Sequence, residues 1–592
     1  MTPQPDREAI RNLQEFPEAA VRLLWNRGLR EREAVTRFLE PDWERDTHDP
    51  FLFRDMRSAC QLVWDTLQQG EPIVVYGDYD ADGVTGSVVL VSVFRDLARR
   101  MGQDPGLVSS YIPHREREGY GIQTEAVERL LAGGMRLLVS VDCGIGSARE
   151  ISAAQAGGAK AIVVDHHQVP ETVPDCLTIH PSAPGETYPF RNLAAVGVAF
   201  KLACGLAAFS RERGIDFPAG YEKWMLDLVA IATVTDVVPL LGENRVLERF
   251  GLIVLNKTRR LGLAKLMEAA GLDSGSVDTR SIGFGIGPRI NAASRMDHAS
   301  VAFECLMAES GESAATLAER LNQINLERQR LTEQMSRVAL AQAAENRDRP
   351  IHVISGDGWS AGVVGIIAGR MTNETGRPSF VFGREGDRFV GSGRSVPEFD
   401  VMAALDDVRD CLFRYGGHPQ ACGMTIVGQD NFERFRGKME ERAGKILEGI
   451  DLRPAIDIDA EISASQVDWR LVECLGKMEP FGEGNPKPRF LMAGLQVVSL
   501  ACIGKDSRHV RMGVRGDSPR EMKTIGFGLA EAAVAFPPGS RIDSVVELGI
   551  NEWNGRKEIQ VQLIDIRPAA EQGNVRESAY AAGKAAGSGL VR

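Results

Sequence analysis

Three aspartates follow a short apolar run near the start of the chain, and this arrangement constrains the fold more than any other feature. Residues 73–76 form a β-branched and aromatic run that predicts a buried strand. Asp78, Asp80 and Asp82 follow at alternate positions. The apolar face of residues 87–100 then predicts a helix. A strand, an acidic turn and a helix form the first unit of a doubly wound α/β domain, in which ligands bind at the carboxyl ends of the strands. Because three like charges on one turn repel each other, we expect a cation there.

Two further roles are open to this turn when it is considered alone. It can cap a helix without binding a metal, and it resembles the Asp-x-Asp turn of haloacid-dehalogenase-type phosphatases, whose first aspartate is a nucleophile. Three further apolar segments separate the alternatives, because each also ends in acids or histidines. The residues that end these segments are Asp142, then Asp165, His166 and His167, and finally Asp236.

We expect all four apolar segments to be strands of one parallel sheet. Their carboxyl ends would then lie along one edge. The side chains that this edge would bring together are Asp80, Asp82, Asp142, His166 and Asp236. Two local alternatives remain, namely a helix cap for Asp142 and a packed histidine pair in a turn. Asp227 precedes its apolar segment and is expected to be structural.

Carboxylates and imidazoles without thiolates suit Mn²⁺ or Mg²⁺, and histidine favours Mn²⁺. Two such ions about 3.5–4 Å apart clamp the attacking and leaving oxygens in phosphodiester hydrolysis. The nine cysteines include no C-x-x-C pair, which argues against a zinc site and against a disulfide framework. The absence of a P-loop motif argues against ATP hydrolysis.

Composition restricts the class of protein further. The 592 residues predict three or four domains, and 43% hydrophobic and 25% charged residues are typical of a soluble globular protein. The net charge of −12 argues against coating nucleic acid by bulk positive charge, but it permits local clusters of arginine and lysine. The amino terminus lacks an apolar signal core and no stretch predicts a transmembrane helix, so we expect a cytoplasmic protein without a membrane partner.

The pattern along the chain predicts six segments. Residues 312–349 contain no glycine or proline and predict one long helix, on the order of 50 Å. Short alternating segments near the carboxyl end predict a small five-stranded barrel. The segments are a helical arm (1–50), a first α/β domain (51–300), a connecting helix (301–349), a second α/β domain (350–453), an all-β domain (454–567) and a disordered tail (568–592).

The motifs resemble a known family. DYDADG, VDCG, DHH and the aspartate of TVTDVVPL resemble the four motifs of the DHH phosphoesterase superfamily. The segments LLWNRGL, DPFLFRDM, GPRINAASR, LNQINLERQ, GVVGIIAGR, GSGRS, GGHPQACG and EPFGEGNPKPRF resemble RecJ exonucleases, from about Leu23 to Ile566. The resemblance implies a DHH domain, a connecting helix, a DHH-associated domain and an OB-fold that wrap a channel for one DNA strand. It also implies 5′-to-3′ hydrolysis of single-stranded DNA to 5′-mononucleotides in DNA repair and recombination. A monomer is expected, with single-strand-binding protein and a helicase as candidate partners.

The resemblance assigns roles at the candidate site. The metal ligands that it implies are Asp80, Asp82, Asp142, His166 and Asp236, with Asp142 bridging two ions. His167 would contact the scissile phosphate, so the catalytic candidates are Asp142, His166 and His167. Related phosphoesterases carry a histidine where this chain has Tyr76, and Asp78 is assigned to that ligand role instead.

Other residues are candidates for DNA binding. Arg289, Asn291 and Arg295 lie in a segment bounded by glycine and proline that predicts a phosphate-binding loop. Backbone N–H groups of glycine turns can also cradle phosphates. The second set of candidates, expected in such turns, is Arg370, Ser392, Arg394, Ser395 and His418.

In the barrel, Trp553 is the candidate platform for base stacking and Phe527 is expected in the core. The basic residues expected to hold the strand there are Lys505, Arg508, His509, Arg511, Arg556 and Lys557.

Two positions depart from the family pattern. Ser294 replaces a usual glycine and could crowd a tight turn, and Ser360 stands where a histidine is common.

Two other functions remain as alternatives, namely a phosphodiesterase for short oligonucleotides or cyclic dinucleotides and a non-catalytic replisome scaffold. Because scaffolds of that type lose metal ligands, the filled ligand positions argue against the second. The phosphatase alternative gives no role to Asp165, His166 and His167.

Overall fold

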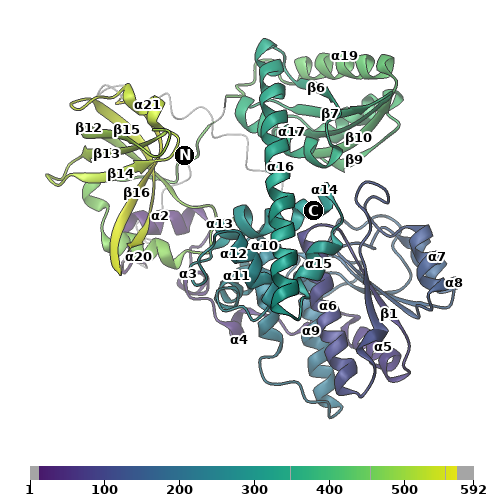
Figure 1. The fold of residues 1–592 in the computed structure, drawn as a ribbon. Coiled ribbons are helices and arrows are strands. Elements are labelled where there is room, and N and C mark those ends of the chain that lie inside the picture. The colour runs from purple at the N-terminus through teal and green to yellow at the C-terminus, as the bar shows by residue number, and fades with distance from the viewer. Residues whose placement is uncertain (1–12, 347, 454, 554, 570–592) are drawn as a thin grey trace. The chain divides into compact units, whose positions relative to one another are not determined.

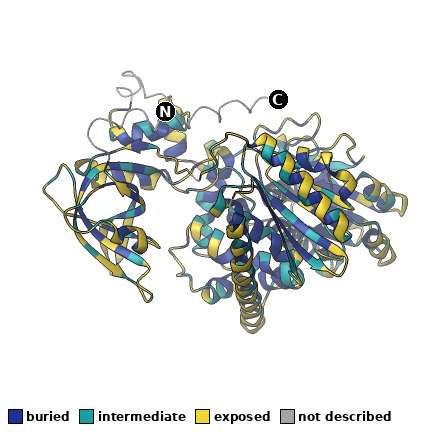
Figure 2. Ribbon diagram, turned by 90° about the horizontal axis from the view of Figure 1, so that it is seen from above, coloured by how far each residue is buried: buried dark blue, intermediate teal, exposed yellow. Residues whose placement is uncertain are grey.

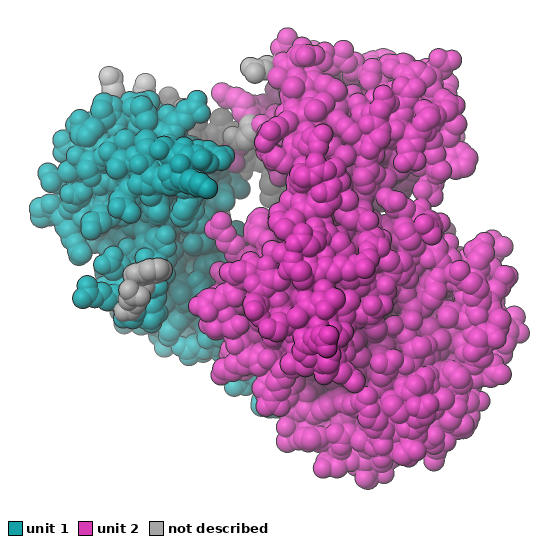
Figure 3. All heavy atoms as spheres, in the orientation of Figure 1, with its two compact units in different colours: residues 1–47, 239–249, 456–592 teal, residues 48–238, 250–455 magenta. Residues whose placement is uncertain are grey.

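A computed structural model describes residues 13–346, 348–453, 455–553 and 555–569. The chain divides into two compact units, one of residues 1–47, 239–249 and 456–592 and the other of residues 48–238 and 250–455 (Figure 3). Most of the tail that the sequence predicts to be disordered, residues 570–592, lies outside the described residues. No helix among the residues described is both long and apolar enough to cross a membrane.

The first sheet of the larger unit has five parallel strands in the order β2-β1-β3-β4-β5 (Figure 1). One face, including Val74 and Tyr76, shares a core with Ala126 of α7 and Ile151 of α8, and α6 and α9 pack together and against the sheet. Helices on both faces confirm the expected doubly wound fold. The elements are η1 (Pro50–Leu52), α5 (Met56–Gln68), β1 (Ile73–Gly77), α6 (Ala81–Arg100), η2 (Pro105–Leu107), β2 (Val108–Tyr111), α7 (Thr124–Ala132), β3 (Leu137–Val141), α8 (Ala148–Ala156), β4 (Lys160–Val164), β5 (Leu177–Ile179) and α9 (Ala195–Glu212).

The fourth apolar segment is a helix, so its assignment as a strand is wrong. Residues Leu226–Thr235 form α10, and Asp236 is its carboxyl-terminal cap. This helix is buried almost all round, so its sequence is a continuous apolar run that periodicity cannot distinguish from a buried strand. Two short strands that the sequence did not predict, β2 and β5, form the edges of the sheet instead.

Helices follow the first sheet and lead to the second α/β domain. The expected connecting helix is α16 (Gly311–Glu345), whose 35 residues span about 52 Å. It packs against α12, α14 and α15 of the first domain and against α17 and β6 of the second (Figure 1). The remaining elements are η3 (Glu222–Met225), α11 (Gly242–Leu255), α12 (Leu261–Ala269), α13 (Thr279–Ser281), η4 (Ile282–Ile286, a π-helix), α14 (Gly287–Met296) and α15 (Ser300–Leu306).

The second α/β domain has a mixed sheet in the order β6-β7-β8-β10-β9, in which only β6 and β7 are parallel. Gly391 and Gly393 lie within β8. A Cβ atom at Gly391 would come within 2.2 Å of Phe382, and one at Gly393 would come within 2.7 Å of Phe380. These glycines therefore permit close packing and do not form turns. The elements are β6 (His352–Asp357), α17 (Ala361–Thr375), β7 (Ser379–Glu385), β8 (Arg388–Arg394), α18 (Val401–Asp407), η5 (Arg409–Cys411), β9 (Arg414–His418), β10 (Ala421–Val427) and α19 (Gln429–Ile446).

The smaller unit contains the expected barrel. Strand β12 pairs with both β13 and β15, which closes the sheet, and it alternates buried with more exposed residues along much of its length. Buried and exposed residues are interspersed along the strands of this unit (Figure 2). The five strands agree with the segments predicted from the sequence. The elements are α2 (Glu18–Asn26), α3 (Arg32–Leu39), α4 (Trp43–Asp46), β11 (Ala460–Glu461), η6 (Ala464–Gln466), α20 (Trp469–Lys477), β12 (Arg489–Ile503), β13 (His509–Arg515), β14 (Met522–Gly526), α21 (Ala530–Val534), β15 (Arg541–Trp553) and β16 (Arg556–Pro568).

The amino-terminal arm and the barrel share one hydrophobic core. Leu23 and Phe38 of the arm belong to the same buried cluster as Phe490 and Met492 of β12. Arg245 adds a polar link, since its guanidinium donates to carbonyl oxygens of both Phe38 and Glu479. The arm is thus part of the fold of this unit.

Candidate active site

The carboxyl edge of the first sheet gathers the predicted acids and histidines. Asp78 directly follows β1, Asp142 follows β3, and Asp165, His166 and His167 follow β4. Asp80 caps the amino terminus of α6 and Asp82 lies in its first turn. Asp236 arrives from the end of α10. The predicted set therefore converges, although one member reaches the site by a helix.

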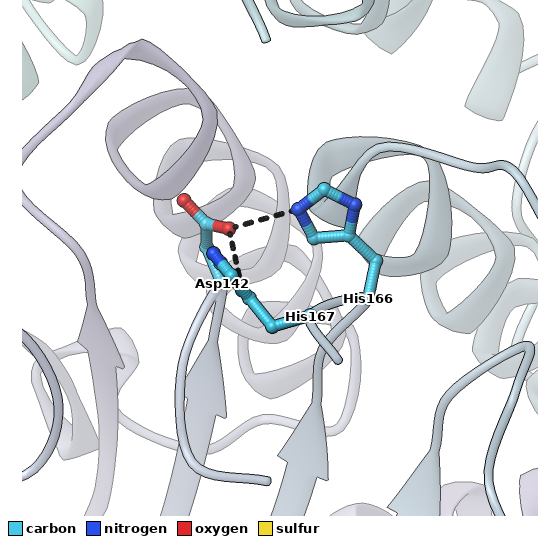
Figure 4. Close-up of side chains that lie close together, drawn as sticks. All are labelled: Asp142, His166 and His167. Atoms are coloured by element: carbon cyan, nitrogen blue, oxygen red, sulfur yellow. Dashed lines mark ion pairs between the residues drawn. The ribbon is translucent and has the colours of Figure 1, made fainter. Parts of the chain in front are cut away.

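His166 lies at the centre of one group of candidate ligands. Its Nε2 atom is 3.4 Å from Oδ1 of Asp142, 3.7 Å from Oδ2 of Asp82 and 3.5 Å from Oδ2 of Asp236. The same Asp142 oxygen lies 3.7 Å from Nδ1 of His167 (Figure 4). Three side chains thus face His166 with oxygen atoms.

Asp142 belongs to a second group as well. Ligand atoms of Asp78, Asp80 and Asp142 lie within 4.8 Å of one another, as do those of Asp142, His166 and His167, and those of Asp82, His166 and Asp236. Tyr76 takes no part, because its hydroxyl donates to the carbonyl of Gly121. Asp142 is the member that links the Asp78 and Asp80 carboxylates to the histidines.

Backbone N–H groups hold the acidic turn in place. Asp82 accepts from the N–H groups of Ala195 and Val196, at 2.7 and 2.8 Å, where α9 begins. Asp80 accepts from the N–H groups of Asp82 and Gly83. These bonds fix both carboxylates at helix amino termini, where negative charge is stabilised.

The burial of these groups fits a bound cation. Asp142 has a φ of 63°, an uncommon value for a residue other than glycine, and its Oδ1 has no hydrogen-bond partner among the described residues. Oδ1 of Asp78 and Nε2 of His166 are also buried without a hydrogen-bond partner among these residues. Buried polar atoms without partners are costly, and bound cations would satisfy all three.

The electrostatics agree with a cation site. Burial, and then the neighbouring Asp82 and Asp80, raise the pKa of Asp142 well above its usual value. Burial and Asp80 raise the pKa of Asp82 to about 7. Burial and the adjacent His167 lower the pKa of His166 to about 4, so its imidazole is neutral and able to ligate. The donor set of carboxylates and neutral imidazole suits Mn²⁺ or Mg²⁺.

His167 is oriented by a buried carboxylate. Nδ1 of His167 lies 2.9 Å from Oδ1 of Asp165. The backbone carbonyl of His167 accepts from Nε2 of His180. That nitrogen is the donor because Nδ1 of His180 accepts from the N–H group of Ser182. Burial alone would lower the pKa of His167, but the hydrogen bond to Asp165 raises it. The ring also packs 5.2 Å from that of Tyr120, whose hydroxyl donates to the carbonyl of Asp142.

The predicted phosphate loop is a helix, so the expectation of a loop is wrong. Arg289, Asn291 and Arg295 lie on α14, whose first turn accommodates Pro288 because a proline there needs no hydrogen-bond partner. Asn291 accepts from the N–H group of Ala81 and so helps to cap α6. Ser294 is buried within this helix and donates to the carbonyl of Asn291, so it crowds no turn.

A cluster of arginines lies beside the acids. Burial, followed by repulsion from Arg115, Arg328 and Arg394, lowers the pKa of Arg295 to about 9. Arg115 stacks over the ring of Tyr79 and also acts on the pKa of Asp78. Asp80 offsets only part of this repulsion at Arg295, and a phosphate group would offset more of it.

The sequence interpretation missed Arg115. It lies in the loop after β2, and the carboxyl end of β2 lies on the same sheet edge as the acids. Residues 111–122 on their own predict only a polar loop. Recognition of Val108–Tyr111 as a parallel strand would have placed the arginine near the site.

The second set of candidates does not lie in glycine turns, so that expectation is also wrong. Ser392 and Arg394 are in β8, where Arg394 donates to the Ser392 hydroxyl, and both lie close to Gly365 of α17. His418 ends β9 and is exposed. Ser395 directly follows β8 and donates to the carbonyl of Phe399.

Arg370 and Ser360 lie at α17 in different environments. Arg370 forms ion pairs of 2.8 Å with both Glu333 and Glu374, which occupy its charge. The Ser360 hydroxyl caps the helix by accepting from the N–H group of Gly362. Arg295 donates to the carbonyl of Gly362, so α14 and the start of α17 are in contact.

Of the two barrel aromatics, Phe527 and Trp553, the first lies in an environment that differs from the one expected. Phe527 is 51% exposed and packs edge-to-face with His509, so its assignment to the core is wrong. Phe527 lies in a turn after β14 between two glycines, which have no side chains that could cover the ring. Trp553 ends β15, and its side chain lies outside the described part of the structure.

Family models and known proteins match most of the chain. The models for the DHH family N-terminal domain, the DHHA1 domain and the RecJ OB domain match residues 72–233, 348–445 and 458–565. The single-stranded-DNA-specific exonuclease RecJ of Bacillus subtilis (strain 168) is 35% identical over 95% of this chain and 70% of its own length. The protein of the same name from Escherichia coli (strain K12) is 30% identical over 94% of this chain and 96% of its own.

Solved structures agree with these matches. A crystal structure of RecJ in complex with Mn²⁺ from Thermus thermophilus superposes with a TM-score of 0.79 and 29% identity, covering 96% of this chain and 79% of that one. A Mg²⁺ complex of RecJ from the same organism gives a TM-score of 0.74 and 28% identity over 96% of this chain and 78% of that one. The acids and histidines at the sheet edge, the two α/β domains and the barrel occur together in this chain. The chain therefore belongs to the RecJ family of DHH nucleases.

Proposed function

We propose that this nuclease degrades single-stranded DNA from the 5′ end and releases 5′-mononucleotides, using two divalent ions. The observation that carries the proposal is the position of Asp142, which belongs to two groups of candidate ligands. The names of the relatives and the barrel at the carboxyl end support single-stranded DNA as the substrate. A role in DNA repair and recombination, in the cytoplasm, is part of the proposal.

One ion would be held by Asp78, Asp80 and Asp142, and the other by Asp82, His166 and Asp236, with Asp142 shared. Bound ions would neutralise the developing charge on the phosphate and lower the pKa of a coordinated water. Mn²⁺ is favoured over Mg²⁺ by the imidazole in the donor set.

The chain's own residues would hold and orient the phosphate. His167 keeps Nδ1 directed at Asp165, which leaves Nε2 to donate to a phosphate oxygen. Arg115, Arg295 and Arg394 are mutually repelling cations, and a phosphate group of the strand would relieve that repulsion. Because such a cluster can hold a terminal phosphate as well as an internal one, it is compatible with entry of a 5′ end.

Digestion of one oligonucleotide labelled at either end tests the proposal. With Mn²⁺ and single-stranded DNA, a 5′ label should appear first as a mononucleotide, while a 3′ label should remain on shortening strands. Duplex DNA of the same sequence should resist. Release of the 3′ label first, or equal cleavage of a dinucleotide and the long strand, would contradict the proposal.

We further propose a monomer that is recruited by single-strand-binding protein and by a helicase. Sedimentation of the full chain tests the oligomeric state. Co-sedimentation with each purified partner in the absence of DNA tests recruitment, because binding that requires DNA would mean that only the shared strand connects them.

A further inference from the structure

A cavity of about 550 Å³ lies in the larger unit between the last two turns of α6, the segment η3, the start of α12 and the residues after α15. Its volume is in the range of small-molecule sites. Asp80 caps the opposite end of α6, and Arg95 is fifteen residues further along, about 22 Å at 1.5 Å per residue. The cavity is therefore separate from the candidate active site.

Four arginines and two acids, Asp96 and Glu309, line this cavity, so the charges of the arginines are partly balanced. Arg99 pairs with Asp96 at 2.9 Å, and Arg260 lies 3.4 Å from the buried carboxylate of Asp227. Arg95 donates to the carbonyl of Val108, and no carboxylate of the described residues is within ion-pair distance of it. Burial and then the neighbouring Arg99 lower the pKa of Arg95, and the nearby carboxylate of Glu309 opposes this shift.

Arg259 is the second arginine of the cavity for which the described residues offer no carboxylate within ion-pair distance. Its guanidinium lies 3.5 Å from the ring centroid of Trp224, a side chain that is 38% exposed. Two guanidinium groups without an ion-pair partner, those of Arg95 and Arg259, suit a phosphate monoester, which carries about −1.5 to −2 at pH 7. A phosphodiester or a single carboxylate would offer these two groups less negative charge.

The remaining lining suits a planar apolar group next to that charge. Trp224, Met225, Leu261 and Met307 contribute apolar surface, and Leu261 is 44% exposed. Stacking on tryptophan and contact with methionine are favourable for an aromatic ring. Charge and apolar surface in one cavity thus describe a ligand with both features.

We propose that this cavity binds a nucleoside monophosphate, with the phosphate at Arg95 and Arg259 and the base beside Trp224. The site does not depend on the substrate proposed for the active site. Arg259 is exposed in the segment between α11 and α12, outside any helix or strand, so its removal disturbs no element of the fold. Arg388, an exposed arginine on β8, is the matched control.

The full chain without metal ions is titrated with 2′-deoxyadenosine 5′-monophosphate by calorimetry and by tryptophan fluorescence. Saturable binding is expected, weakened roughly tenfold or more by Arg259→Ala and unchanged by Arg388→Ala. Trp224→Phe should remove the fluorescence change, because Trp224 is the ring in contact. Deoxyadenosine and inorganic phosphate should each bind roughly tenfold more weakly than the nucleotide.

Three results would overturn the inference. One is the absence of saturable binding to the wild-type protein. Another is equal affinity for inorganic phosphate, which would make the cavity a phosphate site only. The third is binding that survives Arg259→Ala but is lost in Arg295→Ala, which would place the nucleotide at the arginine cluster of the active site. Loss of exonuclease activity without a change in nucleotide binding would count against the proposed function and leave this inference standing.

Discussion

Oδ1 of Asp165 lies 2.9 Å from Nδ1 of His167 and also accepts from the backbone N–H groups of His166 and His167. Burial would raise the pKa of Asp165, but the hydrogen bond and the charge of His167 lower it to about 2, so the carboxylate is ionised. One buried anion thus fixes both the direction of the His167 ring and the turn that presents His166. By this positioning Asp165, which is outside the candidate ligand groups, would orient a metal ligand.

Asp165→Asn should therefore lower turnover or Mn²⁺ affinity roughly 10- to 100-fold without unfolding the protein. The amide keeps the size of the side chain but removes the charge that favours a protonated His167. Turnover on a labelled single strand and the Mn²⁺ dependence of the rate are the measurements. Asp227→Asn changes a buried aspartate that accepts from Thr258 and lies nine residues, about 14 Å, from Asp236 along α10, and it should leave both quantities near wild type.

Asp142→Asn should abolish turnover, and in the absence of metal it should stabilise the fold. The reason is that Asp142 is buried against Asp82 and Asp80, which raise its pKa, so its removal relieves repulsion. The thermal midpoint in EDTA should rise by about 2 °C or more, while stabilisation by added Mn²⁺ should shrink. Turnover within tenfold of wild type would exclude a shared role for this carboxylate.

The positions of the strands account for how much of this site the sequence could predict. Asp78, Asp142 and His166 follow β-branched runs, and such runs form parallel strands whose ends must meet. Asp236 reaches the same edge although its predicted strand is a helix, because a helix buried on all sides and a buried strand have the same apolar composition. The convergence of residues could be inferred from topology, but the element that delivers each residue could not.

Side-chain pairing could not be predicted from motifs either. Arg370 and Arg394 both belong to segments that resemble family motifs. Arg370 is paired with Glu333 and Glu374, whereas Arg394 has no acidic partner among the described residues. Which arginine retains an unbalanced charge depends on distant residues that the fold brings near, such as Glu333 on α16. Arg115 was missed because β2 has only four residues, too short for a clear alternation.

Arg115→Ala should weaken binding of a 5′-phosphorylated strand more than that of the same strand with a 5′ hydroxyl. Its guanidinium is part of the cluster that lowers the pKa of Arg295, so a terminal phosphate there would lose one of its cations. The slope of log K against log salt should fall by about one unit. Arg370→Ala is the control, and its paired charge should leave the slope unchanged; equal effects of the two variants would remove Arg115 from the phosphate site.

His352 provides a pH dependence that is independent of the metal site. It is 4% exposed at the start of β6, and burial, then Arg377 and Arg349, lower its pKa to about 4. Between pH 4 and 6.5 the unfolded state therefore binds more protons than the native state, so stability is lost as the pH falls through this range. His352→Gln should flatten the dependence of the urea midpoint on pH between 7 and 4. His418→Gln, which changes an exposed histidine in the same domain, should not.

Phe527 offers the sharpest test of the barrel. A truncation before residue 454 is a poor test, because the arm shares its core with the barrel and Leu23 and Phe38 would lose their packing. Phe527 is 51% exposed beside His509, and Arg511 and Lys505 are exposed nearby in the sequence, so a base could stack there while the backbone meets positive charge.

Stacking of one base on an aromatic ring contributes roughly 1–3 kcal/mol, so Phe527→Ala should weaken the affinity for a long single strand about tenfold or more. The candidate metal ligands all lie outside the barrel, so the cleavage rate of a trinucleotide should be unchanged. The matched control is Trp469→Ala, which removes a ring 42% exposed on α20 of the same unit. If Phe527→Ala and Trp469→Ala weaken binding of the long strand equally, or if the trinucleotide is affected as strongly, then the ring at 527 does not hold the strand.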